Sequence, residues 1–148
     1  MSTLPRASGP PYTTVMLRLE THRDVTRVVM STPISRAAGY DVSAYLVRGV
    51  LIDLGFPAVA RDLAALLDRT RPSGAIITHH HEDHGGNAEL AARVGLPIGA
   101  SEATLALLRA PEPLAPFRRL IWGTPPRLAT SIVPFADDAL RLVPTPGH

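Results

Sequence analysis

The side chains best suited to chemistry are concentrated between residues 78 and 87, where the sequence reads Thr-His-His-His-Glu-Asp-His-Gly-Gly-Asn. Four of the six histidines of the chain occupy positions 79, 80, 81 and 84. Imidazole nitrogens and carboxylate oxygens at this density suit a divalent transition metal, above all zinc. Because the 148-residue chain contains no cysteine, such a site must be built from His, Asp and Glu. This donor set favours an open catalytic site over a closed structural one.

The segment before these histidines must hold them in place. The apolar run at residues 75–78 predicts a short buried strand, and a turn at the carboxyl end of a strand can aim several side chains into one cleft. If the backbone is still extended there, we expect His79 and His81 to point the same way. Asp83 and His84 follow where the chain turns, so they are expected to face a neighbouring position.

The rest of the sequence indicates alternating strands and helices. Short runs rich in Val, Leu, Ile and Thr predict strands over residues 13–19, 26–30, 43–47, 50–53, 75–78 and 97–100, with a last one at 140–143. Helical spacing predicts helices over residues 58–69, 87–94 and 101–108, and a short helical piece near 117–122. We expect the polar stretch 20–24 to separate the first two strands, and Arg48-Gly49 to form a hairpin turn. This alternation indicates a layered α/β sheet with helices on its outer face.

The sequence resembles the metallo-β-lactamase superfamily in three segments. His-x-His-x-Asp-His after an apolar strand, here His79, His81, Asp83 and His84, is similar to the signature of that family. Residues 51–55, Leu-Ile-Asp-Leu-Gly, resemble its strand that ends in Asp-x-Gly. Residues 145–148, Thr-Pro-Gly-His, resemble a segment whose His is a metal ligand. The resemblance spans residues 13–148, which we expect to form one domain after a disordered tail at 1–12.

The resemblance implies a fold of the α+β class, the αββα sandwich in which two sheets pack face to face. Family members normally continue well past the Thr-Pro-Gly-His segment. We therefore expect this chain to be the N-terminal portion of such a domain, with the C-terminal half-sandwich largely missing and the second metal site incomplete.

The resemblance also implies roles for individual residues. The implied ligands are His79, His81 and His148 for a first zinc ion, and Asp83 and His84 for a second. Asp83 is also the implied catalytic residue, which orients the nucleophile. Asp53 would lie beneath the site and orient a ligand imidazole. His80 and Glu82 occupy variable positions of the signature, so no ligand role is expected for them.

The function implied by the resemblance is that of a zinc-dependent hydrolase. In such enzymes a metal-bound hydroxide attacks an ester, thioester, lactone or related bond. The spacing around the histidines resembles the glyoxalase-II-type thioesterases more than true β-lactamases. Three alternatives stay open, namely a catalytically incomplete metal-binding fragment, a phosphodiesterase or nuclease of the same superfamily, and an iron-containing redox relative. Redox members keep an acidic residue in place of one ligand His, whereas His84 is of the hydrolytic type.

Composition narrows the range of partners. Hydrophobic residues make up 45% of the chain and charged residues 19%, values typical of a globular protein. A net charge of +2 is too small to indicate binding to nucleic acid or to an anionic membrane. We therefore expect a small-molecule substrate and no membrane partner. The N-terminus lacks the apolar core of a signal peptide, which predicts a cytoplasmic protein. A homodimer in which two chains complete one sandwich is a further alternative.

Overall fold

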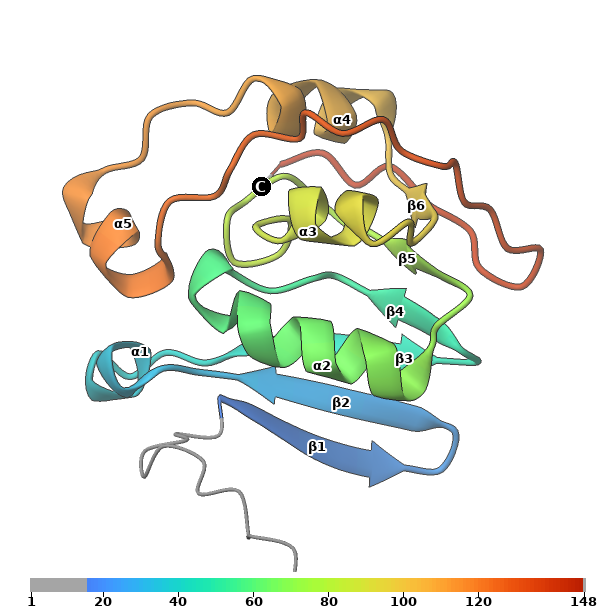
Figure 1. Ribbon diagram of the computed structural model, residues 1–148, viewed down its shortest axis with the longest axis horizontal. Helices are drawn as coiled ribbons and strands as arrows, with labels where there is room; N and C mark the ends of the chain where they lie inside the picture. Colours follow the sequence, from blue (N-terminus) through green and yellow to red (C-terminus); the bar gives the residue numbers. More distant parts are fainter. Residues whose placement is uncertain (1–15, 148) are drawn as a thin grey trace, which may run out of the picture.

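A six-stranded mixed sheet forms the centre of the molecule (Figure 1) in a computed structural model that describes residues 16–147. The strands follow the chain order, as β1 (Leu17–His22), β2 (Val25–Met30), β3 (Val42–Val47), β4 (Val50–Ile52), β5 (Gly74–Ile76) and β6 (Ile98–Gly99). The first four strands pair antiparallel, whereas β4, β5 and β6 pair parallel. The carboxyl ends of β4 and β5 therefore lie side by side at the same end of the sheet.

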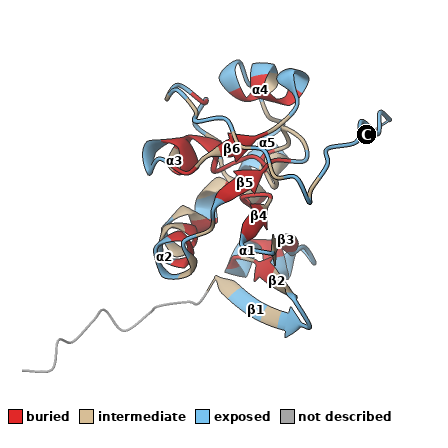
Figure 2. Ribbon diagram, turned by 90° about the vertical axis from the view of Figure 1, so that its right-hand side faces the viewer, coloured by how far each residue is buried: buried red, intermediate tan, exposed pale blue. Residues whose placement is uncertain are grey.

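Six helical elements connect and cover these strands. They are α1 (Pro33–Ala37), the 3-10 turn η1 (Pro57–Val59), α2 (Ala60–Thr70), α3 (Ala88–Arg93), α4 (Glu102–Arg109) and α5 (Pro116–Trp122). Figure 2 shows α2 and α3 on the same side of the sheet. In α2 the buried Leu63, Leu66 and Leu67 lie on one helix face and join the core formed with the strands. Each buried leucine stabilises the fold by roughly 1.5–3 kcal/mol. This packing holds the strands whose carboxyl ends carry the site.

The C-terminal segment lies along the free edge of β6. The Ile98 N–H donates to the carbonyl of Val133 at 2.8 Å, and the Phe135 N–H donates to the carbonyl of Ile98 at 3.0 Å. The Phe135 ring lies directly over Gly74, where an added Cβ would come within 2.2 Å of it. Figure 2 shows the chain then leaving on the side of the sheet opposite α2 and α3. The described residues contain this one sheet, with α2 and α3 packed on one of its faces (Figure 2).

The layered α/β class is confirmed, and so are most of the predicted elements. The predicted turn at Arg48-Gly49 joins β3 to β4, with both residues at positive φ, 52° and 80°, as a two-residue hairpin requires. Ser101 caps α4 as expected, because its side chain accepts a hydrogen bond from the Thr104 N–H. Part of the first predicted strand, residues 13–15, lies outside the described residues.

Two predictions were wrong and one helix was missed. Of the polar stretch 20–24 only Arg23 and Asp24 lie between the strands, because β1 continues to His22 at an edge of the sheet where polar side chains face solvent. Residues 140–143 form no strand, since Leu140 has only an isolated bridge to Asp137. The missed helix is α1, whose start could have been read from the N-cap Thr32 followed by Pro33 at the first helical position.

The helices between residues 16 and 147 are all too short or too polar to cross a lipid bilayer.

Candidate metal centre

The site is built on two loops that leave neighbouring parallel strands. The Asp53 N–H, directly after β4, donates to the carbonyl of Ile76 at 2.8 Å. One residue later, the Leu54 N–H donates to the carbonyl of His84 at 2.8 Å. Asp53 itself has a φ of 64°, in the left-handed region that Asp tolerates better than most residues. These contacts tie the loop after β4 to the loop that carries the histidines.

The Asp53 carboxylate accepts hydrogen bonds from three donor groups, and the residue is only 5% exposed. It accepts from the Thr78 N–H at 2.8 Å and from the Thr78 hydroxyl at 2.9 Å. It also accepts from Nδ1 of His84 at 2.8 Å. Because a buried carboxylate needs such donors, Asp53, Thr78 and His84 form one fixed unit.

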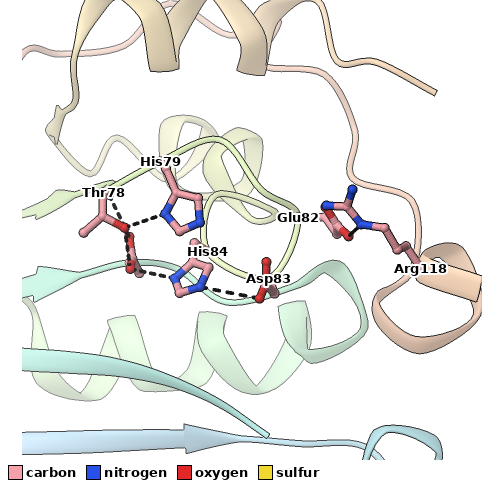
Figure 3. Close-up of polar contacts among 7 residues, drawn as sticks. Thr78, His79, Glu82, Asp83, His84 and Arg118 are labelled. Atoms are coloured by element: carbon pink, nitrogen blue, oxygen red, sulfur yellow. Dashed lines mark hydrogen bonds and ion pairs between the residues drawn. The ribbon is translucent and has the colours of Figure 1, made fainter. Parts of the chain in front are cut away.

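Thr78 extends this network to a second histidine (Figure 3). The Thr78 hydroxyl lies 2.9 Å from Nδ1 of His79. Since the carboxylate of Asp53 can only accept, the hydroxyl donates its single proton to Asp53 and accepts from His79. Both His79 and His84 therefore carry their proton on Nδ1, and Nε2 of each ring carries none. This is the tautomer in which a histidine binds a metal through Nε2.

The imidazole rings converge in front of this network. The ring centroids of His79 and His84 are 4.2 Å apart, and those of His79 and His81 are 4.9 Å apart. Asp83 adds a carboxylate, with Oδ2 at 3.4 Å from Nε2 of His84 (Figure 3). The structure thus brings together four of the five predicted ligands. The fifth, His148, lies outside the described residues, so its contribution stays a prediction.

Negative charge surrounds these imidazoles. The pKa of His84 is raised above its ordinary value, chiefly by the hydrogen bond to Asp53, and burial opposes this shift. The charges of Asp53, Asp83 and Glu82 raise the pKa of His84 further. These negative charges favour a cation beside the rings, whereas a proton on His84 competes with a metal ion for that residue.

Glu82 lies in the middle of the signature and is almost fully buried, with a side chain that is 2% exposed. Its carboxylate accepts from Nε of Arg118 at 2.6 Å and from Nη2 at 2.7 Å, a two-pronged ion pair (Figure 3). Arg118 belongs to α5, 36 residues further along the chain. Sequence analysis missed this pair because no local pattern connects the two residues.

The exit from the histidine loop is equally constrained. A Cβ on Gly86 would lie 2.1 Å from the carbonyl oxygen of Glu82, so a side chain cannot be accommodated there. The buried Asn87 side chain donates to the carbonyls of Leu54 and Phe56 at 2.9 and 2.8 Å. These contacts fix the histidine loop against the loop after β4.

A cavity of about 800 Å³ opens beside the histidines. It is lined by Thr78, His79, His84, Ser101 and residues 142–146. Its volume is in the range of small-molecule sites. A second cavity of about 120 Å³ adjoins His80 and His81 on the other side, with walls made mainly of leucines and prolines.

The donor set fits a zinc ion in kind, although residues 16–147 contain no group of three or more His, Asp or Glu side chains arranged to hold one by themselves. The rings of His79, His81 and His84 lie close together and the Asp83 carboxylate lies beside His84, while the Nδ1 atoms of His79 and His84 are engaged by Thr78 and Asp53. This is the arrangement in which a second row of residues orients the ligands of a metal.

Known proteins are similar to this chain in sequence and in fold. A sequence model described as Metallo-beta-lactamase superfamily matches residues 37–148. Among solved structures, the metallo-beta-lactamase FIM-1 from Pseudomonas aeruginosa in its mono-zinc form is similar at 16% identity and a TM-score of 0.56, over 84% of this chain and 53% of that one. A metallo-beta-lactamase from Pontibacter korlensis is similar at 22% identity and a TM-score of 0.51, over 82% of this chain and 54% of that one.

DIM-1 metallo-beta-lactamase is similar at 19% identity and a TM-score of 0.51, over 62% of this chain and 45% of that one. No curated protein matches the sequence. The chain thus spans about half the length of the solved structures that it matches. At these identities the structures show the shared fold, and the sequence match covers most of the chain. The chain belongs to the metallo-β-lactamase superfamily.

Proposed function

We propose that the protein is a zinc-dependent hydrolase that cleaves an ester, thioester or lactone. Membership of the superfamily supports a metallo-hydrolase. The observation that carries the proposal is the contact between Asp53 and His84. A histidine that binds a metal usually donates its other ring N–H to a carboxylate, which fixes its tautomer, and Asp53 is placed to accept that bond.

The ligands follow from the family signature. His79 and His81, together with His148, would hold one ion, and Asp83 and His84 would contribute to a second. Bound there, zinc would supply Lewis acidity, which polarises a carbonyl and lowers the pKa of a bound water far below its ordinary value, toward ~7.

The residues of the chain have separate tasks in this proposal. Asp53 keeps the proton of His84 on Nδ1, and Thr78 does the same for His79. Asp83 Oδ2 stands beside Nε2 of His84, where a carboxylate can orient a nucleophilic water and accept its proton. The side chains of Leu142 and Val143 line the cavity and offer apolar surface to a substrate.

The lining of the cavity favours a carbonyl substrate over a phosphodiester. Among the described residues that line it, none carries an Arg or Lys side chain. Phosphate recognition usually relies on such cations. A neutral ester, thioester or lactone needs no cation beyond the metal, so it suits this cavity better.

Hydrolysis of a panel of substrates by the zinc-loaded protein tests the proposal. The panel holds a p-nitrophenyl ester, an acyl thioester, a lactone and bis(p-nitrophenyl) phosphate. We expect turnover of at least one carbonyl substrate and a loss of about 10²–10⁴-fold in Asp83→Asn, the range for removing a proton-transfer group. Asp68→Asn, at an exposed position of α2, is the matched control and should retain activity. Zinc binding without turnover of any carbonyl substrate would contradict the proposal.

A further inference from the structure

We propose that Arg118 is a positioning residue that holds the metal-binding loop in place through Glu82. This inference rests on the proposed function, because it concerns the geometry of the same metal ligands. The signature itself assigns no role to Glu82, and Arg118 lies outside it.

The first step of the argument is the place of Glu82 in the chain. It lies between His81 and Asp83, two predicted ligands whose Cα atoms are each ~3.8 Å from its own. The two hydrogen bonds from Arg118, at 2.6 and 2.7 Å, fix the carboxylate in position and direction. Any displacement of Glu82 therefore moves the backbone that carries both ligands.

The second step is that Arg118 is itself held firmly. Its helix, α5, begins at Pro116 and ends at Trp122, whose ring packs against Phe56 with centroids 4.9 Å apart and against Tyr40 at 6.0 Å. Phe56 is fully buried and lies three residues after Asp53. Helix α5 thus contacts the loop after β4 through Trp122 and the loop after β5 through Arg118. These are the two loops that form the metal centre.

The third step is the cost of breaking the pair. The side chain of Arg118 is 41% exposed and reaches from solvent to a carboxylate that is 2% exposed. Loss of one partner of a buried ion pair leaves an uncompensated charge, which is strongly destabilising. Without Arg118, the buried Glu82 carboxylate has lost its countercharge and is driven to move toward water. This movement alters the segment between His81 and Asp83, so the geometry of the metal site should change with it.

The test compares Arg118→Met, Arg118→Lys and Glu82→Gln with the unaltered protein, with Arg119→Met as the matched control at an exposed position of the same helix. Zinc affinity is measured by competition with a chromophoric chelator, and ligand geometry by the visible absorption of bound Co²⁺. Because Trp122 is the only tryptophan, its fluorescence reports the position of α5 during zinc titration.

We expect Arg118→Met and Glu82→Gln to weaken zinc binding by about 10–100-fold, as for other residues that orient metal ligands. Their Co²⁺ spectrum should change, and the response of Trp122 fluorescence to zinc should diminish. Arg118→Lys retains the charge but cannot donate in the same two-pronged way, so its loss should be intermediate. It also carries the test if Arg118→Met does not fold.

Two outcomes separate this inference from the proposed function. If the unaltered protein binds no zinc, the proposed function fails and this inference falls with it. If the unaltered protein binds zinc and the folded Glu82 and Arg118 variants bind it with the same affinity and the same Co²⁺ spectrum, then only the positioning role is overturned. A loss of thermal stability with unchanged zinc affinity would assign the pair to the fold alone.

Discussion

Nδ1 of His84 lies 2.8 Å from the carboxylate of Asp53, a residue 31 positions earlier in the chain. Asp53 directly follows β4, whereas His84 lies in the loop that follows β5. The same carboxylate accepts a hydrogen bond from the Thr78 hydroxyl, and this hydroxyl in turn accepts one from Nδ1 of His79. One buried acid therefore orients two imidazoles before any metal arrives.

Asp53→Asn should weaken zinc binding by about 10–100-fold, the usual effect of removing a residue that orients metal ligands. Asn keeps the size of the side chain and tolerates the positive φ of 64°, so the variant isolates the loss of charge from backbone strain. Chelator competition measures the affinity, with Asp68→Asn as the exposed control. Unchanged zinc affinity in Asp53→Asn would show that this carboxylate serves only the fold.

Thr78→Val should also weaken zinc binding, because it removes the hydroxyl between His79 and Asp53 while it keeps the shape of the side chain. Thr78→Ser retains the hydroxyl and should bind zinc nearly as the unaltered protein does. Equal affinities in the Val and Ser variants would refute the relay from His79 through Thr78 to Asp53.

Gly86→Ala should destabilise the protein by about 1–3 kcal/mol or more, the range for overpacking. Its new Cβ would lie 2.1 Å from the carbonyl oxygen of Glu82 and 3.0 Å from that of Gly55, and backbone cannot move aside cheaply. The neighbouring Gly85→Ala is the matched control. Its closest contact is a flexible side-chain atom of Leu108 at 2.9 Å, so the loss should be smaller. Denaturant unfolding followed by Trp122 fluorescence measures both variants, and the opposite order of stability would contradict the packing described.

The pH dependence of stability should reveal a third buried carboxylate, that of Glu89 in α3. It accepts from the backbone N–H groups of Thr130 and Ala129, from the Thr130 hydroxyl and from Nε of Arg93. These bonds, with the Thr130 backbone first and Arg93 next, lower the pKa of Glu89 from 4.5 to about 2. Since the folded pKa is below the unfolded one, ionised Glu89 stabilises the fold above pH 4.5, and this contribution is lost as the pH falls toward 2.

Glu89→Gln should therefore be less stable than the unaltered protein at neutral pH, with a difference in unfolding free energy that shrinks below pH 4.5. Glu112→Gln, at an exposed position, should show no such trend. Urea unfolding across the acidic range provides the comparison. A difference that stays constant through pH 4 would contradict the assigned role of Glu89.

Much of the fold was predictable because its signals are local. The turn at Arg48-Gly49 and the cap at Ser101 depend on residues next to one another, and helical spacing predicted α2. The prediction of a strand at residues 140–143 was wrong for a physical reason. A strand is stabilised by hydrogen bonds to a neighbouring strand, and the residue pattern of one segment does not show whether such a neighbour exists. Similarly, the polar end of β1 is compatible with a strand only because that strand lies at an edge of the sheet.

The candidate site divides in the same way. The side chains of His79, His81, Asp83 and His84 belong to one short loop, so their proximity could be expected from spacing. Asp53 was expected beneath them only through the family resemblance. The ion pair between Glu82 and Arg118 joins residues 36 positions apart. No periodicity or motif encodes such a contact, because it depends on where α5 packs.

A zinc titration of the protein and of two histidine variants tests the central claim most directly. The affinity and the number of bound ions are measured by chelator competition and elemental analysis. We predict at least one tightly bound zinc per chain, which is lost in His79→Ala and kept in His22→Ala, a variant of an exposed histidine in β1. Equal zinc binding by the two variants would contradict the account. A lack of zinc binding by the unaltered protein would contradict it as well.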